Sequence, residues 1–121
     1  MGNKNKAKGT SFEVLVRDYM REHGFIHAHR PALSGGKDSG DVNGIIQRDT
    51  LSEVAVQCKN QKTFKLSEWL DATVEQAKNL REGLPMLVVK RAGKGAKALG
   101  DSYVVMRLDD VIRLLSDADY S

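Results

Sequence analysis

The sequence is poor in features that mark several protein classes. It contains a single cysteine, Cys58, which excludes an intrachain disulfide and a cysteine-based zinc cluster. No apolar run approaches the roughly 20 residues that a helix needs to span a bilayer. No apolar segment follows the N-terminal lysines, so a secretory signal is not expected. We therefore expect a protein of the reducing cytoplasm that has no membrane partner.

An excess of charge of one sign is also missing, since the formal net charge is only +3. The distribution of charge is more informative. Residues 1–8 contain three lysines and no acidic residue, whereas residues 109–119 contain four aspartates. Two further basic clusters are Lys59, Lys62 and Lys65, and Lys90, Arg91, Lys94 and Lys97. Such segregation suits a protein with one phosphate-facing side, although solvated loops alone explain charge patterns of this size.

The length of 121 residues suits one domain, which can bury a core without disulfides. Residues 1–9 are basic and rich in lysine, asparagine and glycine, which predicts a flexible arm. Residues 10–121 contain no repeat and no linker long enough to divide them, so we expect a single domain there.

Hydrophobic periodicity predicts the element order α-β-β-β-α-β-β-α and hence an α/β fold with a central mixed sheet flanked by helices. The predicted helices start at Thr10, near Ser67 and at Asp109, and the predicted strands cover residues 25–29, 41–47, 53–60, 86–90 and 103–106. The apolar run 86–90 suits a central strand. The second helix should bury a face made of Leu66, Leu70, Val74, Ala77 and Leu80.

Polar residues on and before the third predicted strand suggest chemistry. Gln57 and Lys59 are two residues apart on a strand, so their side chains point to one face, and Asp41 begins the preceding strand. A carboxylate binds a hard divalent cation that polarises a phosphoryl group, and a neighbouring lysine stabilises the charged transition state. The Gln57 side chain and the Cys58 backbone carbonyl offer further ligands. This set supplies what phosphodiester hydrolysis needs.

Asp41, followed after 15 intervening residues by Gln57-Cys58-Lys59, resembles the motif of the PD-(D/E)XK nuclease superfamily. The predicted element order is similar to the restriction-endonuclease-like core of that family. Within the family, the chain resembles archaeal and phage-type Holliday junction resolvases, which carry a helical Glu, an Arg and a Ser before the Asp strand. The matching residues are Glu13, Arg30, Ser34, Asp41, Gln57 and Lys59.

The resemblance implies an endonuclease that depends on Mg²⁺ or Mn²⁺ and cuts four-way DNA junctions. The implied catalytic residues are Glu13, Asp41, Gln57 and Lys59, and the implied metal ligands are Asp41, Glu13, Gln57 and the Cys58 carbonyl. The expected DNA contacts are Arg30, Ser34, Lys62, Arg91, Lys94 and Lys97. Cutting two opposed strands of a junction needs two sites related by two-fold symmetry, so a homodimer is expected.

Gln57 departs from the pattern because it replaces the second carboxylate of the motif. An amide carries no charge, so the affinity for a cation should fall. Mrr-type restriction enzymes are similar in using Gln-x-Lys, so the replacement is compatible with an active site. It leaves open a restriction or repair endonuclease acting on duplex or flapped DNA. From a different class, a non-catalytic DNA-binding module on a nuclease-like fold also stays open.

Some of these residues have simpler interpretations. Thr10 and Glu13 match a capping box, in which Glu13 would only stabilise a helix start. Asp41 follows a serine and a glycine and is typical of a turn when taken alone. Gln76 sits on the second predicted helix and could reach the active face, but we predict a solvated helix position for it.

Overall fold

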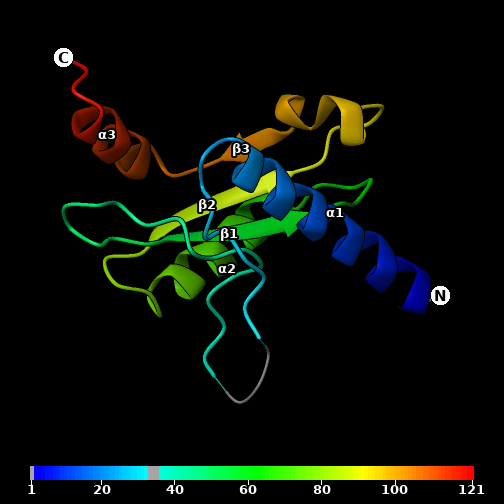
Figure 1. Cartoon of the computed structure of the whole chain (residues 1–121). Coiled ribbons are helices and arrows are strands. Elements are labelled where there is room, and N and C mark those ends of the chain that lie inside the picture. The colour runs from blue at the N-terminus through cyan, green and yellow to red at the C-terminus, as the bar shows by residue number, and fades with distance from the viewer. Residues whose placement is uncertain (1, 33–35) are drawn as a thin grey trace.

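The computed structural model describes residues 2–32 and 36–121. Helix α1 lies across one face of a central sheet and helix α2 covers the other (Figure 1). The helices are α1 (Gly2–Glu22), α2 (Leu66–Ala77) and α3 (Leu108–Asp117), and a 3-10 helix, η1, covers Ala96–Asp101. The strands are β1 (Val54–Lys59), β2 (Leu84–Val89) and β3 (Tyr103–Val105).

The sheet has the strand order β1-β2-β3. β1 and β2 are parallel, which requires a crossover connection, and α2 supplies it. β3 pairs antiparallel with β2, so the sheet is mixed, as the sequence predicted. Leu87 in β2 is fully buried, which confirms that the apolar run is the central strand.

Alternate side chains of the strands pack against different helices. Val56 of β1 and Val88 of β2 share a core cluster with Phe12 of α1. Leu87, which points the other way, packs with Trp69 of α2. The two faces of β1 therefore have different surroundings, and this decides where its polar side chains can lie.

The first two predicted strands, residues 25–29 and 41–47, are not continuous strands in the structure. Isolated antiparallel bridges form instead, and they are His29↔Asn43, Val42↔Val56 and Ile46↔Glu53. Gly40 and Gly44 interrupt the extended backbone, since their φ angles are +105° and +87°, in the left-handed region. The segment that follows Gly40 still runs along the free edge of β1, as the predicted pairing required.

Helix α1 begins at Gly2, whereas the sequence predicted an irregular segment through residue 9 and a helix from Thr10. The predicted start is wrong because lysine and alanine, which dominate residues 4–8, are good helix formers and no proline interrupts them. Thr10 consequently lies inside the helix and cannot be its N-cap. The capping-box interpretation of Glu13 is therefore wrong as well.

The buried face of α2 also differs from the prediction. Trp69, Thr73 and Gln76 are buried together with the predicted Ala77, whereas Leu66 is 41% exposed. The indole needs the most space, so the helix turns it toward the sheet, and the residues four and seven positions later follow on the same face. Gln76 is thus a buried residue, and the predicted solvated position is wrong.

Helix α3 begins at Leu108, next to the predicted cap Asp109, and lies apart from the sheet at the C-terminal end (Figure 1). Arg113 ties it to the body by donating to the carbonyl oxygen of Glu82 at 2.8 Å. Its Leu108 side chain is 74% exposed. No helix in the described residues is long and apolar enough to cross a bilayer.

Candidate active site

Asp41 lies at the edge of β1. Its backbone N–H donates to the carbonyl oxygen of Val56 at 2.7 Å, and its Oδ2 atom accepts a hydrogen bond from the N–H of Cys58 at 2.8 Å. Gly40 makes this approach possible, because a Cβ at that position would lie 2.9 Å from the Val56 carbonyl oxygen. The left-handed glycine thus sets the position of the Asp41 carboxylate against the strand.

Gln57 and Lys59 project from β1 toward α2, on the face opposite to the core side chain of Cys58. The ammonium nitrogen of Lys59 is 5.7 Å from the centroid of the Trp69 ring. Gln57 is 8% exposed, and its Oε1 atom has no hydrogen-bond partner among the described residues. A buried oxygen without a donor is unfavourable by roughly 1–3 kcal/mol, which indicates a place for a ligand.

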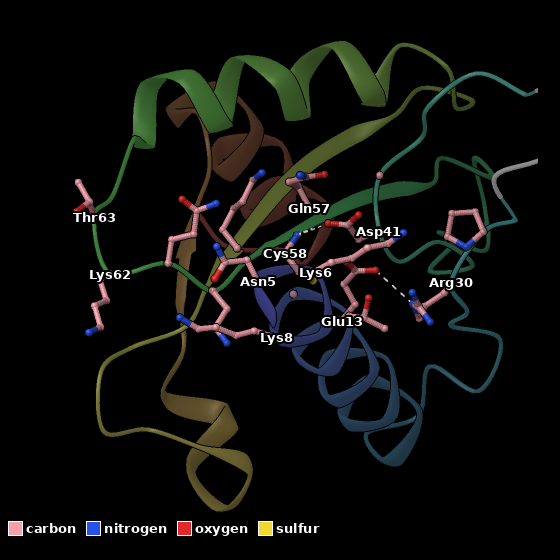
Figure 2. A pocket seen from close by; sticks show the side chains of 17 residues that line it. Asn5, Lys6, Lys8, Glu13, Arg30, Asp41, Gln57, Cys58, Lys62 and Thr63 are labelled. Atoms are coloured by element: carbon pink, nitrogen blue, oxygen red, sulfur yellow. Dashed lines mark hydrogen bonds and ion pairs between the residues drawn. The ribbon is translucent and has the colours of Figure 1, made fainter. Parts of the chain in front are cut away.

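Glu13 reaches the same place from helix α1. Figure 2 shows its side chain near Asp41, in a cavity that Gln57 and Lys59 also line. The cavity has a volume of about 790 Å³. The Oε1 atom of Glu13 accepts a hydrogen bond from the Nε atom of Arg30 at 3.3 Å. The structure therefore brings together the four residues predicted to be catalytic and places Arg30 beside one of them.

The surroundings of the Asp41 carboxyl disfavour its ionised form. Its pKa is raised from 3.8 to about 6, mainly by burial, and the nearby carboxylates of Glu13 and Asp38 contribute to this increase. The Cys58 N–H and the Lys59 ammonium act in the opposite direction. Two carboxylates in a partly buried site repel each other when both are ionised, and a bound cation would relieve this repulsion.

The donor set fits a hard divalent cation. Glu13 and Asp41 offer carboxylate oxygens, and Gln57 offers its unsatisfied amide oxygen. Mg²⁺ is held in proteins by one or two carboxylates and keeps several of its waters. In the part of the chain that the structure describes, no three His, Cys, Asp or Glu side chains are grouped to hold a metal. The site thus offers two charged ligands and a neutral one.

Asp38 is a residue of the site that the sequence analysis missed. Its Oδ2 atom accepts a hydrogen bond from the buried Gln76 amide at 3.0 Å, and its carbonyl oxygen accepts one from Asn79 at 2.6 Å. Its Oδ1 atom accepts one from the N–H of Gly40 at 3.0 Å. The end of α2 therefore anchors the turn that presents Asp41. The Asp-x-Gly pattern of residues 38–40 is a turn signal that could have identified Asp38.

The predicted DNA contacts are divided between two places. Lys62 lines the cavity, together with Lys6 and Lys8 from the first turns of α1 (Figure 2). The loop residues lie elsewhere: Arg91 stacks over Tyr103, Lys94 pairs with Asp101 at 3.5 Å, and Lys97 is exposed. Ser34 lies outside the described residues.

Comparison with known proteins supports the same interpretation of the site. The sequence model of the phage putative PDDEXK endonuclease family matches residues 4–121. No curated protein and no solved structure gives a significant match. The family match spans almost the whole chain, including Glu13, Asp41, Gln57 and Lys59. The chain therefore belongs to the phage putative PDDEXK endonuclease family, within the PD-(D/E)XK superfamily of nucleases.

Proposed function

We propose that this protein is a metal-dependent endonuclease that cuts branched DNA, with the four-way junction as its preferred substrate. The observation that carries the nuclease assignment is the convergence of Glu13, Asp41 and the unsatisfied Gln57 oxygen beside Lys59. The preference for a junction rests on the order Glu13, Arg30, Asp41, Gln57, Lys59, which resembles that of junction resolvases. The Arg30–Glu13 ion pair supports it, because the pair sets Arg30 at the cavity.

Each residue of the site has a distinct role in this proposal. Asp41, Glu13 and the Gln57 amide would hold the metal, with the Cys58 carbonyl as a further ligand. Mg²⁺ or Mn²⁺ supplies a Lewis acid for the scissile phosphate when it is bound there. Lys59 places a positive charge where negative charge develops at phosphorus, and it orients the attacking water. Its position over Trp69 limits the range of orientations of its long side chain.

The lysines around the cavity would bind the DNA backbone. Lys6, Lys8 and Lys62 carry positive charge on the rim of the cavity that contains the carboxylates. Each phosphate contact releases counterions, so the affinity should fall as salt increases and should not depend on sequence. Symmetric cutting of a junction needs a second active site, and we therefore propose a homodimer.

A cleavage assay with three DNAs tests the proposal. A synthetic four-way junction, a linear duplex of the same sequence and a flapped duplex are each incubated with the protein and Mg²⁺. Paired nicks on opposed strands of the junction, with little cutting of the duplex, are the expected result. Equal cutting of the linear duplex favours a restriction or repair endonuclease. Binding without cutting, in Mg²⁺ and in Mn²⁺, would contradict both enzymatic functions and favour a DNA-binding module.

The Gln57→Glu variant tests the role of the amide in binding metal. A carboxylate on β1 adds a third charged ligand at the position of the unsatisfied oxygen, so the metal should bind more tightly. We expect the Mg²⁺ concentration for half-maximal cleavage to fall by about tenfold. Gln47→Glu, which adds the same charge in a remote turn, is the matched control. An unchanged Mg²⁺ requirement in a folded Gln57→Glu protein would remove Gln57 from the ligand set.

A further inference from the structure

An aromatic residue, Tyr103, lies in the same row of the sheet as Lys59 of the proposed site. Lys59 pairs with Val89 across β1 and β2, and Val89 pairs with Tyr103 across β2 and β3. Paired residues on neighbouring strands point to the same face of a sheet, so Lys59 and Tyr103 stand in one row. Two strand spacings separate them, which places their Cα atoms about 10 Å apart. The catalytic end of β1 and the exposed edge strand β3 thus share one surface.

Three aromatic rings cover this row. The ring centroids of Phe64 and Tyr103 are 6.0 Å apart in an edge-to-face arrangement, and those of Phe64 and Trp69 are 6.1 Å apart. We call Phe64, Trp69 and Tyr103 the aromatic ledge. Trp69 is buried and serves the core, but Phe64 is 40% exposed and Tyr103 is 46% exposed. Packing within the protein therefore explains the first ring, whereas the other two side chains stay partly exposed to solvent.

Cations lie at both ends of the ledge. The Lys59 ammonium is 5.7 Å from the Trp69 centroid, and the Arg91 guanidinium carbon is 5.0 Å from the Tyr103 centroid. Lys62, on the rim of the cavity, precedes Phe64 by two residues (Figure 2). Exposed rings between positive charges are the chemistry that binds single-stranded nucleic acid, because bases stack on the rings while the cations meet the phosphates.

We propose that the aromatic ledge binds an unpaired nucleobase of the DNA strand next to the scissile phosphate. This inference rests on the proposed endonuclease function, and it narrows the substrate to DNA that has unpaired nucleotides at the cut. Bases in an intact duplex are stacked on their neighbours and cannot offer a free face to Phe64 or Tyr103. A strand leaving a branch point or a flap does offer such a face.

The direct test uses DNA that contains 2-aminopurine, a base whose fluorescence is quenched when it stacks. The probe is placed in the unpaired arm of a flapped duplex, close to the branch, and in a fully paired duplex of the same sequence. Measurements are made in EDTA, so that no metal is bound and no strand is cut. We expect wild-type protein to quench the probe in the unpaired arm and to leave the paired probe almost unchanged.

The variants Phe64→Leu and Tyr103→Ile, alone and combined, test which rings are responsible. They keep apolar side chains of moderate size, so most of the loss of binding reports on the missing aromatic ring. The double variant should bind the single-stranded arm about tenfold more weakly and lose the quenching, with duplex affinity unchanged. Tyr120→Leu, which removes a more exposed ring outside the ledge, should behave like wild type.

The two proposals fail in different ways. Quenching that persists in the double variant, or no quenching in the wild type, would overturn the ledge even if the protein cuts DNA. A change in oligomeric state of the variants without any change in DNA binding would overturn it too, since the ledge would then be a contact between copies. Quenching by a wild-type protein that cuts no DNA would overturn the endonuclease proposal and leave the ledge in place.

Discussion

Asp41→Asn is expected to lower the rate of DNA cleavage by about 10³-fold. A bound metal contributes several kcal/mol to phosphoryl transfer, and each 1.36 kcal/mol corresponds to a tenfold change in rate. The amide keeps the size of the carboxyl and can still accept the hydrogen bond from the Cys58 N–H, so the turn should remain in place. Single-turnover cleavage of the junction in Mg²⁺ measures the effect, and junction binding in EDTA should stay close to that of wild type.

The same variant should be more stable than the metal-free wild type at pH 8. The folded-state pKa of Asp41 is raised from 3.8 to about 6. Above pH 6 the carboxyl is ionised in the folded state, and this lowers the free energy of unfolding. This penalty is absent below pH 3.8, where the carboxyl is protonated in both states, and is complete above about pH 7. Removing the charge should therefore increase the free energy of unfolding by about 1–3 kcal/mol at pH 8 and by much less at pH 4.

Asp49→Asn is the control for both effects, because Asp49 is an exposed turn residue away from the cavity. It should cut at the wild-type rate, and its free energy of unfolding should follow that of the wild type at each pH. Chemical denaturation at several pH values, in EDTA, gives the comparison. Normal cleavage by the Asp41→Asn protein would show that the proposed site is wrong. A loss of cleavage together with a loss of stability at pH 8 would instead indicate a structural role for the carboxylate.

Lys59→Met should reduce cleavage by about 10²–10³-fold with little effect on junction binding. Removing one preorganised positive group from a transition state has effects of this size. Methionine keeps an apolar stem that can pack on the Trp69 ring, so the variant removes the charge and preserves most of the packing. The loss should appear in the rate at saturating DNA and not in the concentration of DNA needed for half-maximal rate.

Lys65→Met serves as the matched control, since it removes one exposed lysine at the start of α2. It should leave the cleavage rate at saturating DNA unchanged. A Lys59→Met protein that cuts at the wild-type rate would exclude Lys59 from the reaction. If binding weakened and the saturated rate did not change, Lys59 would be a phosphate contact only, and the charge at the reacting phosphorus would have to come from another residue.

Hydrophobic patterns in the sequence were sufficient to predict the central strands of the sheet. The alternation around β1 and the apolar run of β2 predicted both strands, because burial on a sheet leaves a direct pattern. The segments before β1 were predicted less well, since the close approach of Gly44 to the His27 backbone depends on contacts between distant residues. Likewise, helical periodicity alone could not show that α2 turns Trp69 inward.

In the candidate site, too, some residues could be predicted from the sequence and others could not. Asp41, Gln57 and Lys59 were predicted to converge because strand geometry and one predicted pairing bring them together. Asp38 and Gln76 were not, since their hydrogen bond joins a turn to a helix that follows much later in the chain. Charge clustering predicted DNA contacts from residues 91–97 and Lys62, and only Lys62 of these lines the cavity. Lys6 and Lys8 also line it, because helix α1 extends through residues that the sequence predicted to be irregular.

The hydrogen bond between the Asp41 carboxylate and the Cys58 N–H has a consequence for biosynthesis. It joins residues 17 positions apart, and Glu13 must arrive from an earlier helix before the ligand set is complete. A nascent chain that has emerged only through Asp41 contains two of the acids but lacks the strand that holds them. Catalytic competence should therefore appear late, when α1 and the edge segment have docked on β1.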